Sequence, residues 1–405
     1  MAINRIISDI VTKKLFQGKA IILIGARQVG KTTLLKEHFS GKENVLWLNG
    51  DDLETRTLME NITVERYRSM LGGIRILIID EAQRISDIGL KCKLVTDNFP
   101  DIQLIVTGSS SLDLANKVNE PLTGRKWEYR LFPLSYSELA THFGALQEWK
   151  KLPLRLIYGS YPDVVCHPGS EKEILNNLTE SYLYKDILIW ERIKRPDKIV
   201  RLLQALAYQV GSEVSTNELS QMVELDRSTV DKYINLLEEA QVIFRLGTYS
   251  RNLRTEIKSG RKIYFNDNGI RNALIGNFTD IDSRADVGAL WENYMVSELR
   301  KKNAYTLSYA MPYFWRTTQQ QEIDYVEDCE GKLTAYEFKW NPTKKTKVSK
   351  SFLSAYPNTE IHTIHRENYM DYLSTTCLNL KKVDTFGNNT RSKNETKDTD
   401  TTSVQ

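Results

Sequence analysis

The first 140 residues alternate short, continuous apolar runs with segments of helical periodicity. The runs are residues 20–24, 45–48, 74–79 and 104–106, and we expect a fifth strand near 127–131. Strands that are apolar on both sides are buried on both faces, which is typical of a parallel sheet covered by helices. The pattern predicts an α/β domain over residues 1–145.

The middle of the chain is predicted to be mostly helical. Residues 146–212 form a helical segment with a break at Tyr161-Pro162, and residues 213–284 contain two helices and a strand that fit a winged helix. Ser228 or Asp226 is a suitable cap for the second of these helices. Its apolar positions recur at helical spacing, at Val230, Tyr233, Ile234, Leu236 and Leu237.

Residues 285–384 show a helix, several short strands, and then a helix and strand after Lys350. We expect a small α/β domain there. Residues 385–405 are mainly Asn, Thr, Ser, Lys and Asp. Such a segment buries too little apolar surface to offset its ordering entropy, so it is predicted to be disordered.

Composition narrows the function classes only slightly. Of the 405 residues 41% are hydrophobic and 26% are charged, as in ordinary soluble globular proteins, and the net charge of +3 does not by itself imply a polyanionic partner. The four cysteines form no CxxC pair, which argues against a zinc site or a disulfide framework. No signal peptide or run of ~20 apolar residues is present, so we expect a cytoplasmic protein with no membrane partner.

The strongest chemical signal is Gly25–Thr32, which fits G-x-x-x-x-G-K-[ST] at every fixed position. The two glycines let successive backbone N–H groups face phosphates, Lys31 supplies charge, and the Thr32 hydroxyl can ligate Mg²⁺. A plain glycine turn is disfavoured, because the motif lies between an apolar strand and a helix. ATP and Mg²⁺ are the predicted cofactors, and the candidate nucleotide-binding residues are Gly25, Ala26, Arg27, Gln28, Val29, Gly30, Lys31, Thr32 and Thr33.

The run 76–79 leads into Asp80 and Glu81. At the carboxyl end of this apolar strand Asp80 can hold Mg²⁺, directly or through water, and Glu81 can orient the attacking water. An Asp-Glu pair is common as surface charge, but its place after a P-loop favours hydrolysis. Lys31 and Glu81 are therefore candidate catalytic residues.

Two further features complete the predicted site. One hydroxyl of Thr107–Ser111 is suited to contact the γ-phosphate or the water, and a helix N-cap is an equal alternative. Arg125 is a candidate arginine finger, acting within the molecule or across an oligomer interface. A structural ion pair is the alternative for Arg125, and it is slightly favoured.

These motifs, in this order, resemble the AAA-type ATPases of bacteria and archaea whose C-terminal half is a domain of unknown function. The resemblance rests on Gly25–Leu34, Ile79–Gln83, Thr107–Ser111, Leu122–Arg125 and Pro133–Tyr136 with Glu138. It continues, more loosely, through Tyr158–Pro162, Arg261–Phe265, Leu290–Asn293 and Glu337–Lys339, to about residue 370. It implies an ATPase domain, a winged helix and a nuclease-like C-terminal domain, and it implies no known substrate.

The predicted winged helix gives a weaker signal for DNA. Basic residues suited to phosphate contacts line its wing and the following strand, at Arg251, Arg254, Lys258, Arg261 and Lys262. The expected recognition helix also carries acidic residues, Asp231, Glu238 and Glu239. DNA contact and a purely structural role both remain open for this module.

The C-terminal domain carries two carboxylates and a lysine on two predicted strands. Period-two alternation places Glu337 and Lys339 on one face, where Asp324 can meet Glu337 over a metal ion. Glu292, on the preceding helix, is a further candidate ligand, and Lys339 is a candidate catalytic residue. The pattern resembles the PD-(D/E)xK nucleases, in which Mg²⁺ offsets charge during phosphodiester hydrolysis. Alternating charge on the wet face of an ordinary strand is the alternative.

The sequence therefore predicts a magnesium-dependent ATPase whose C-terminal modules act on nucleic acid. Two other classes stay open. One is a nucleotide-dependent regulatory switch that binds DNA or protein without cutting it, and the other is an oligomeric motor built from copies of this chain.

Overall fold

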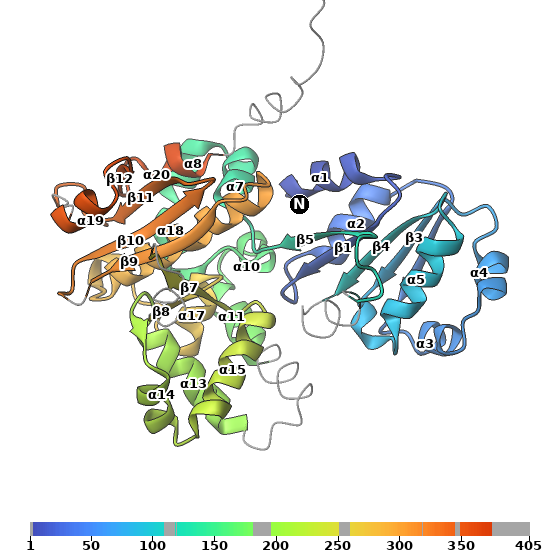
Figure 1. Cartoon of the computed structure of the whole chain (residues 1–405), viewed down its shortest axis with the longest axis horizontal. Coiled ribbons are helices and arrows are strands. Elements are labelled where there is room, and N and C mark those ends of the chain that lie inside the picture. Colours follow the sequence, from blue (N-terminus) through green and yellow to red (C-terminus); the bar gives the residue numbers. More distant parts are fainter. Residues whose placement is uncertain are drawn as a thin grey trace, which may run out of the picture.

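The computed structural model describes residues 3–108, 118, 120–180, 196–250, 260–317, 319–344 and 349–374. In Figure 1 the N-terminal sheet and its helices lie at the right of the molecule, and a second sheet, formed by later parts of the chain, lies at the left. No helix in the described part of the chain is both long enough and apolar enough to cross a membrane.

The N-terminal sheet has five strands, all parallel, in the order β2-β3-β4-β1-β5. Each apolar run of the sequence became a strand: β1 (Ala20–Gly25), β2 (Val45–Asn49), β3 (Ile76–Asp80), β4 (Gln103–Gly108) and β5 (Lys126–Leu131). The predicted parallel sheet is confirmed, including its fifth strand. Because β4 lies between β1 and β3, the two nucleotide motifs end on strands that are not direct neighbours.

Helices cover both faces of this sheet, as predicted (Figure 1). Ile21 and Leu23 of β1 pack on the face of α1 (Ile6–Lys14) and α2 (Lys31–Phe39). Ile22 and Ile24 point to the other face, with α4 (Val64–Met70) and α5 (Ile88–Asn98). The short elements α3 (Leu53–Glu60) and η1 (Ala82–Arg84) belong to the same domain. Alternate residues of one fully buried strand thus serve two cores.

The following segment is helical, as the sequence predicts. It contains α7 (Tyr136–Phe143), α8 (Ala145–Lys150), α9 (Leu152–Tyr158), α10 (Pro162–Cys166), α11 (Glu171–Leu178) and α13 (Pro196–Tyr208). The break at Tyr161-Pro162 is confirmed, because α9 ends before it and α10 starts at the proline, which suits the first position of a helix. A capping box between Ser135 and Glu138 fixes the start of α7.

Two helices and a strand occupy residues 214–248, as predicted: α14 (Thr216–Val223), α15 (Arg227–Glu239) and β7 (Ile243–Thr248). Asp226 caps α15 by accepting a hydrogen bond from the backbone N–H of Thr229. The remaining elements of this part are β6 (Glu213–Val214), β8 (Arg261–Phe265), α17 (Asn268–Leu274) and η4 (Ile281–Ser283).

The C-terminal part is built on the long helix α18. Its elements are α18 (Val287–Tyr305), β9 (Met311–Arg316), β10 (Glu322–Cys329), β11 (Lys332–Phe338), α19 (Lys350–Ala355), β12 (Glu360–Ile364) and α20 (Tyr369–Leu373). Its strands continue the hairpin of the preceding segment in one mixed seven-stranded sheet, β12-β11-β10-β9-β7-β8-β6. The parallel pairing of β7 with β9 makes the sheet continuous across the boundary predicted after residue 284.

A buried arginine near the N-terminus connects these parts. Arg5 pairs with Glu138 of α7, with 3.0 Å between Nε and Oε1. Its Nη1 donates to the carbonyl oxygen of Val29, at 2.7 Å, and its Nη2 donates to that of Phe132, at 2.6 Å. Nη2 also lies 3.4 Å from the hydroxyl of Tyr305, the last residue of α18. One guanidinium therefore joins the P-loop, the exit of β5, α7 and α18.

We expect Arg5→Ala to destabilise the whole chain by about 3–5 kcal/mol, the usual effect of removing one partner of a buried ion pair. The variant would leave the carboxyl group of Glu138 buried without its arginine partner. The melting temperature in calorimetry measures the effect. Arg84→Ala is the control, since Arg84 and Asp51 form a pair whose side chains are 43% and 57% exposed, and its loss should change stability by at most about 1 kcal/mol. Equal melting temperatures for the two variants would contradict this role of Arg5.

Candidate functional site

The predicted phosphate-binding turn connects β1 to α2. The strand ends at Gly25 and the helix begins at Lys31. Gly30 has φ of 95°, a conformation in which L side chains are strained, so glycine is required there. The turn places the N-terminal N–H groups of α2 at the carboxyl edge of the sheet, where a helix N-terminus can bind an anion.

Lys31 folds back over this turn. Its Nζ donates to the carbonyl oxygens of Gly25 and Ala26, at 2.9 Å each, and the residue is buried. Hydrogen bonds between an ammonium and a charged acceptor are stronger than those with a neutral carbonyl. A phosphate in the turn would therefore compete well for this ammonium.

Thr32, Asp80 and Thr107 form a second part of the site. The hydroxyl of Thr32 donates to Oδ2 of Asp80 at 2.7 Å, and the hydroxyl of Thr107 donates to the other carboxylate oxygen, Oδ1. Asp80 ends β3 and is buried. Because β4 lies between β1 and β3, it brings Thr107 beside the carboxylate. The sequence predicted a role for a hydroxyl in Thr107–Ser111; residues 109–111 lie outside the described part of the chain.

The oxygen atoms of Thr32 and Asp80 fit the requirements of Mg²⁺. This ion prefers hard oxygen ligands and is usually held by one or two protein groups together with phosphates and waters. The two side chains already lie within hydrogen-bond distance, so they can share one cation beside the phosphate turn.

Glu81 follows Asp80 in a left-handed conformation, with φ of 47°. Its backbone N–H donates to the hydroxyl of Thr107 at 3.3 Å, and its carboxylate accepts from Nε2 of Gln83 at 2.6 Å. Gly50 packs so closely that a Cβ there would lie 2.3 Å from the carbonyl oxygen of Glu81. Gln83 and Gly50 were not predicted as site residues, and only their place near the Asp-Glu pair hints at their roles.

Arg125 lies away from this edge of the sheet. It immediately precedes β5, and its carbonyl oxygen accepts from the N–H of Ala20, where β1 begins. The phosphate turn lies at the opposite end of β1. The side chain of Arg125 pairs with Asp97, at 2.8 Å between Nε of Arg125 and Oδ1 of Asp97. The ion-pair alternative therefore describes this structure, and the intramolecular finger does not fit the geometry; a contact across an oligomer interface stays a prediction.

A second polar cluster gathers Asp324 of β10, Glu337 of β11 and Lys339. The ammonium of Lys339 lies 2.7 Å from Oε2 of Glu337 and 3.3 Å from Oδ2 of Asp324. Oδ2 of Asp324 also accepts from the N–H of Phe338 at 2.8 Å. The three predicted side chains thus meet between adjacent antiparallel strands.

Glu292 of α18 joins the same region through residues that the sequence did not assign to it. Its Oε1 accepts from the hydroxyl of Tyr264 at 2.6 Å and from Nζ of Lys262 at 2.9 Å. Lys262 also pairs with Glu322 of β10, and its side chain is only 2% exposed. The expectation that Lys262 contacts DNA phosphates is therefore wrong, because its ammonium is buried among carboxylates. Arg261 is exposed, whereas Arg251, Arg254 and Lys258 lie outside the described residues.

Burial and the charge of a neighbouring carboxylate raise the pKa values of Glu337 and Glu292 in this cluster. Burial, together with the charge of Asp324, raises the pKa of Glu337 to about 7, although Lys339 opposes the shift. Burial likewise raises the pKa of Glu292 to about 6, against the attraction of Lys262. Burial alone would lower the pKa of Lys339, but its two carboxylate partners outweigh it, and the pKa is raised. The lysines supply the positive charge that keeps these acids together.

A metal ion at this cluster stays a prediction. Within the described ranges, no three His, Cys, Asp or Glu side chains are grouped so that they could hold a metal ion. Glu292 contacts Lys262, while Asp324 and Glu337 contact Lys339. The carboxylates predicted as metal ligands thus lie in the predicted region, but lysine ammonium groups occupy the positions where a metal ion would bind.

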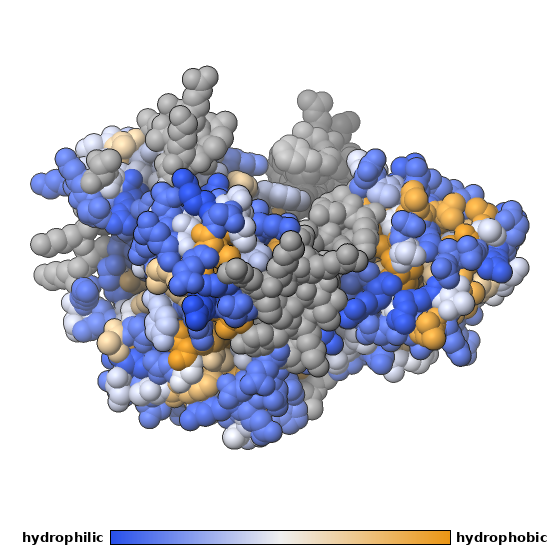
Figure 2. All heavy atoms as spheres, turned by 90° about the horizontal axis from the view of Figure 1, so that it is seen from below, coloured by the Kyte–Doolittle hydropathy of each residue, from blue (hydrophilic) through white to orange (hydrophobic). Residues whose placement is uncertain are grey.

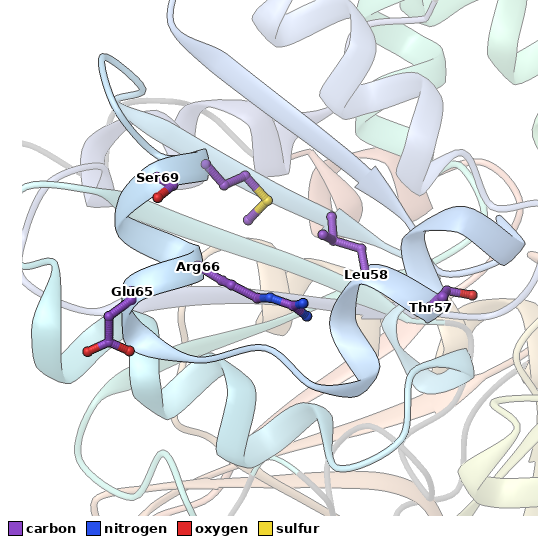
Figure 3. A pocket seen from close by; sticks show the side chains of 6 residues that line it. Thr57, Leu58, Glu65, Arg66 and Ser69 are labelled. Atoms are coloured by element: carbon purple, nitrogen blue, oxygen red, sulfur yellow. The ribbon is translucent and has the colours of Figure 1, made fainter.

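The surface has further features that contain none of the predicted site residues. A hollow of about 720 Å³ lies between α3 and α4, and Figure 3 shows Leu58 and Arg66 pointing toward it from the two helices. Apolar side chains also reach the surface of this domain, as Figure 2 shows from below; Leu53 and Leu90 are 69% and 59% exposed.

Comparisons with known proteins divide the chain into three parts. Residues 17–140 match the model of an AAA domain, residues 150–281 match a domain of unknown function, DUF8612, and residues 287–386 match another, DUF4143. The nucleotide motifs all fall in the first match, and the second polar cluster falls mainly in the third.

The curated relatives are uncharacterized proteins of bacteria and archaea. A protein of Mycobacterium tuberculosis is 25% identical over 350 residues, which cover 85% of this chain and 75% of the relative. A protein of Methanocaldococcus jannaschii is 21% identical over 390 residues, which cover 89% and 84%. Among solved structures, a Walker-type ATPase of Pyrococcus abyssi aligns with a TM-score of 0.49 and 15% identity, over 68% of this chain and 96% of that protein. The chain thus carries an AAA-type P-loop ATPase domain followed by two domains of unknown function.

Proposed function

We propose that this chain binds ATP with Mg²⁺ at the carboxyl edge of its N-terminal sheet and hydrolyses it there. The observation that carries the proposal is the 2.7 Å contact between the Thr32 hydroxyl and the Asp80 carboxylate. It unites the two groups suited to Mg²⁺ beside the P-loop turn. The match of residues 17–140 to an AAA domain supports the same function.

Each side chain has a separate task in this proposal. Lys31 exchanges its carbonyl partners for the β- and γ-phosphates, while the first N–H groups of α2 bind the same anion. Bound Mg²⁺ would neutralise charge that develops on the phosphates. Glu81, held by Gln83, orients and polarises the attacking water. Thr107 fixes the carboxylate of Asp80 and the backbone of Glu81 at once.

We expect Lys31→Ala to abolish tight ATP binding and to leave the fold intact. The lysine supplies charge to the phosphates, and removing it loses charge-assisted hydrogen bonds. Titration with a fluorescent ATP analogue measures binding, and circular dichroism checks the fold. Lys36→Ala, an exposed lysine on the same helix, should bind ATP like the wild type. Unchanged ATP affinity in Lys31→Ala would disprove the P-loop assignment.

We expect Glu81→Gln to bind ATP but to hydrolyse it about 10²–10⁴-fold more slowly, the range that one general base contributes. The amide keeps the shape of the side chain and loses the charge that polarises water. Phosphate release measures turnover. Glu43→Gln, at an exposed position, is the matched control. Wild-type turnover in Glu81→Gln would move the catalytic role to another residue.

A second candidate function is metal-dependent cleavage of nucleic acid at the C-terminal cluster. It is favoured by the meeting of Asp324, Glu337 and Lys339 within one hydrogen-bonded group. The lysine contacts of these carboxylates equally suit the alternative, a nucleotide-dependent switch that binds DNA or protein without cutting it. Function in an oligomer is compatible with either.

We expect metal-dependent nicking of DNA, if this cluster acts as a nuclease, to be lost in Lys339→Ala, and metal binding to be weakened in Asp324→Asn. Nicking of a supercoiled plasmid and titration with Mn²⁺ are the two measurements. Glu330→Gln, in the exposed turn between the same strands, is the control. A wild-type protein that neither binds Mn²⁺ nor nicks DNA would reduce the cluster to a binding scaffold and favour the switch.

A further inference from the structure

The amino edge of the N-terminal sheet, opposite the phosphate-binding turn, carries cations and aromatic rings side by side. The parallel strands β3, β4, β1 and β5 are neighbours in that order, and all four start at this edge. Residues that precede or open these strands, together with the end of α1, form what we call the edge row. Its members are Lys13, Lys14, Phe16, Lys19, Arg75 and Trp127.

Positive side chains lie against both rings of the edge row. The ammonium groups of Lys14 and Lys19 lie 4.4 Å and 4.2 Å from the ring centroid of Trp127. The guanidinium group of Arg75 lies 5.4 Å from the ring centroid of Phe16. Such contacts hold a cation in place without neutralising it, because an aromatic ring carries no net charge. The edge row therefore keeps its positive charge available to an anion.

Carboxylates do not neutralise the edge row either. Two carboxylates near this edge, Asp97 and Glu128, pair with Arg125 and Lys126 instead. Throughout the described ranges, no ion pair involves the four cations of the row, Lys13, Lys14, Lys19 and Arg75. Four unpaired positive charges thus share one edge of the sheet.

A fixed turn between α1 and β1 presents the ring of Phe16. This residue has φ of 58°, a left-handed conformation that is unusual for a bulky side chain. The buried side chain of Gln103 holds the turn at two points. Its Oε1 accepts from the backbone N–H of Phe16 at 2.6 Å, and its Nε2 donates to the carbonyl oxygen of Lys19 at 3.0 Å. The ring of Phe16 nevertheless stays 48% exposed, so one face can accept a flat partner.

We propose that the edge row binds single-stranded nucleic acid, with phosphates on its four unpaired cations and one base stacked on Phe16. Three strand spacings, about 14 Å, separate β3 from β5, so the row suits a linear polyanion better than a single phosphate. Cations beside stacking rings are the usual means of holding a single strand. An anionic membrane surface would require a broad apolar face, whereas Phe16 is the one large apolar side chain that the row exposes. The inference does not depend on the proposed ATPase function or on the C-terminal cluster.

The stacking contact is tested with the full chain and a fluorescein-labelled oligothymidylate, whose binding is measured by anisotropy. EDTA in the buffer prevents metal-dependent cleavage. We expect Phe16→Ala to weaken binding of the single strand about 5–150-fold, the effect of one lost stacking side chain. Its affinity for a duplex of equal length should not change, because paired bases cannot stack on the ring. Leu53→Ala, which removes another exposed apolar side chain of this domain, should bind the single strand like the wild type.

The phosphate contacts are tested by the salt dependence of the same affinity. The double variant Lys14→Gln/Lys19→Gln removes two charges and keeps most of each side chain. We expect the slope of log K against log salt to become shallower by about 1.4, since each phosphate contact on a single strand contributes about 0.7. The control, Lys150→Gln/Lys172→Gln, removes two exposed lysines from α8 and α11 and should keep the wild-type slope.

The opposite results are equally definite. A wild-type protein that does not bind the oligothymidylate would overturn the inference. Wild-type affinity and salt slope in either Phe16→Ala or the Lys14/Lys19 variant would also overturn it, because the strand would then lie elsewhere on the chain. Binding to phosphatidylserine vesicles that these variants lose, with no binding of the oligothymidylate, would assign the edge row to a membrane. Circular dichroism of each variant checks that the fold is retained.

Discussion

The buried ion pair between Arg5 and Glu138 is the interaction on which the rest of the structure depends. A guanidinium out of contact with water is tolerated only when its N–H groups find acceptors. Here those acceptors are Glu138 together with carbonyl oxygens at the P-loop and at the exit of β5. The N-terminal segment therefore holds the phosphate-binding turn through the contact of Arg5 with the carbonyl oxygen of Val29. The same guanidinium joins the turn to residues far apart in the chain.

The segment that leaves β5 is fixed from the other side by α18. Glu298 accepts from the backbone N–H of Tyr136 at 2.7 Å, and Lys301 donates to the carbonyl oxygen of Leu134 at 3.1 Å. Glu298 and Lys301 also pair with each other, at 2.6 Å. Leu134 is thus held relative to the turn by charged groups of a distant helix.

Local signals made the N-terminal domain predictable, whereas contacts between distant segments left no local signal and were missed. Continuous apolar runs marked all five strands, and fixed glycine spacing marked the turn, because both depend on neighbouring residues. The joining of β7 to β9 depends on a pairing between distant segments, which leaves no mark on either strand. Lys262 was misjudged although alternation placed it on one face with Tyr264; its place in a basic run suggested the surface. Arg5 carries no motif at all, and only its partners reveal its role.

The helix α18 places the two polar sites of the molecule in one mechanical unit. Tyr305 at its end contacts Arg5 below the P-loop, and Glu292, thirteen residues earlier, contacts Lys262 in the C-terminal cluster. These residues are about 20 Å apart along a helix whose backbone hydrogen bonds resist bending. The helix α18 is therefore a direct structural connection between the two regions. Coupling between two binding sites is reciprocal. If nucleotide binding changes the affinity of the cluster for a ligand, that ligand changes the affinity of the P-loop for the nucleotide by the same factor.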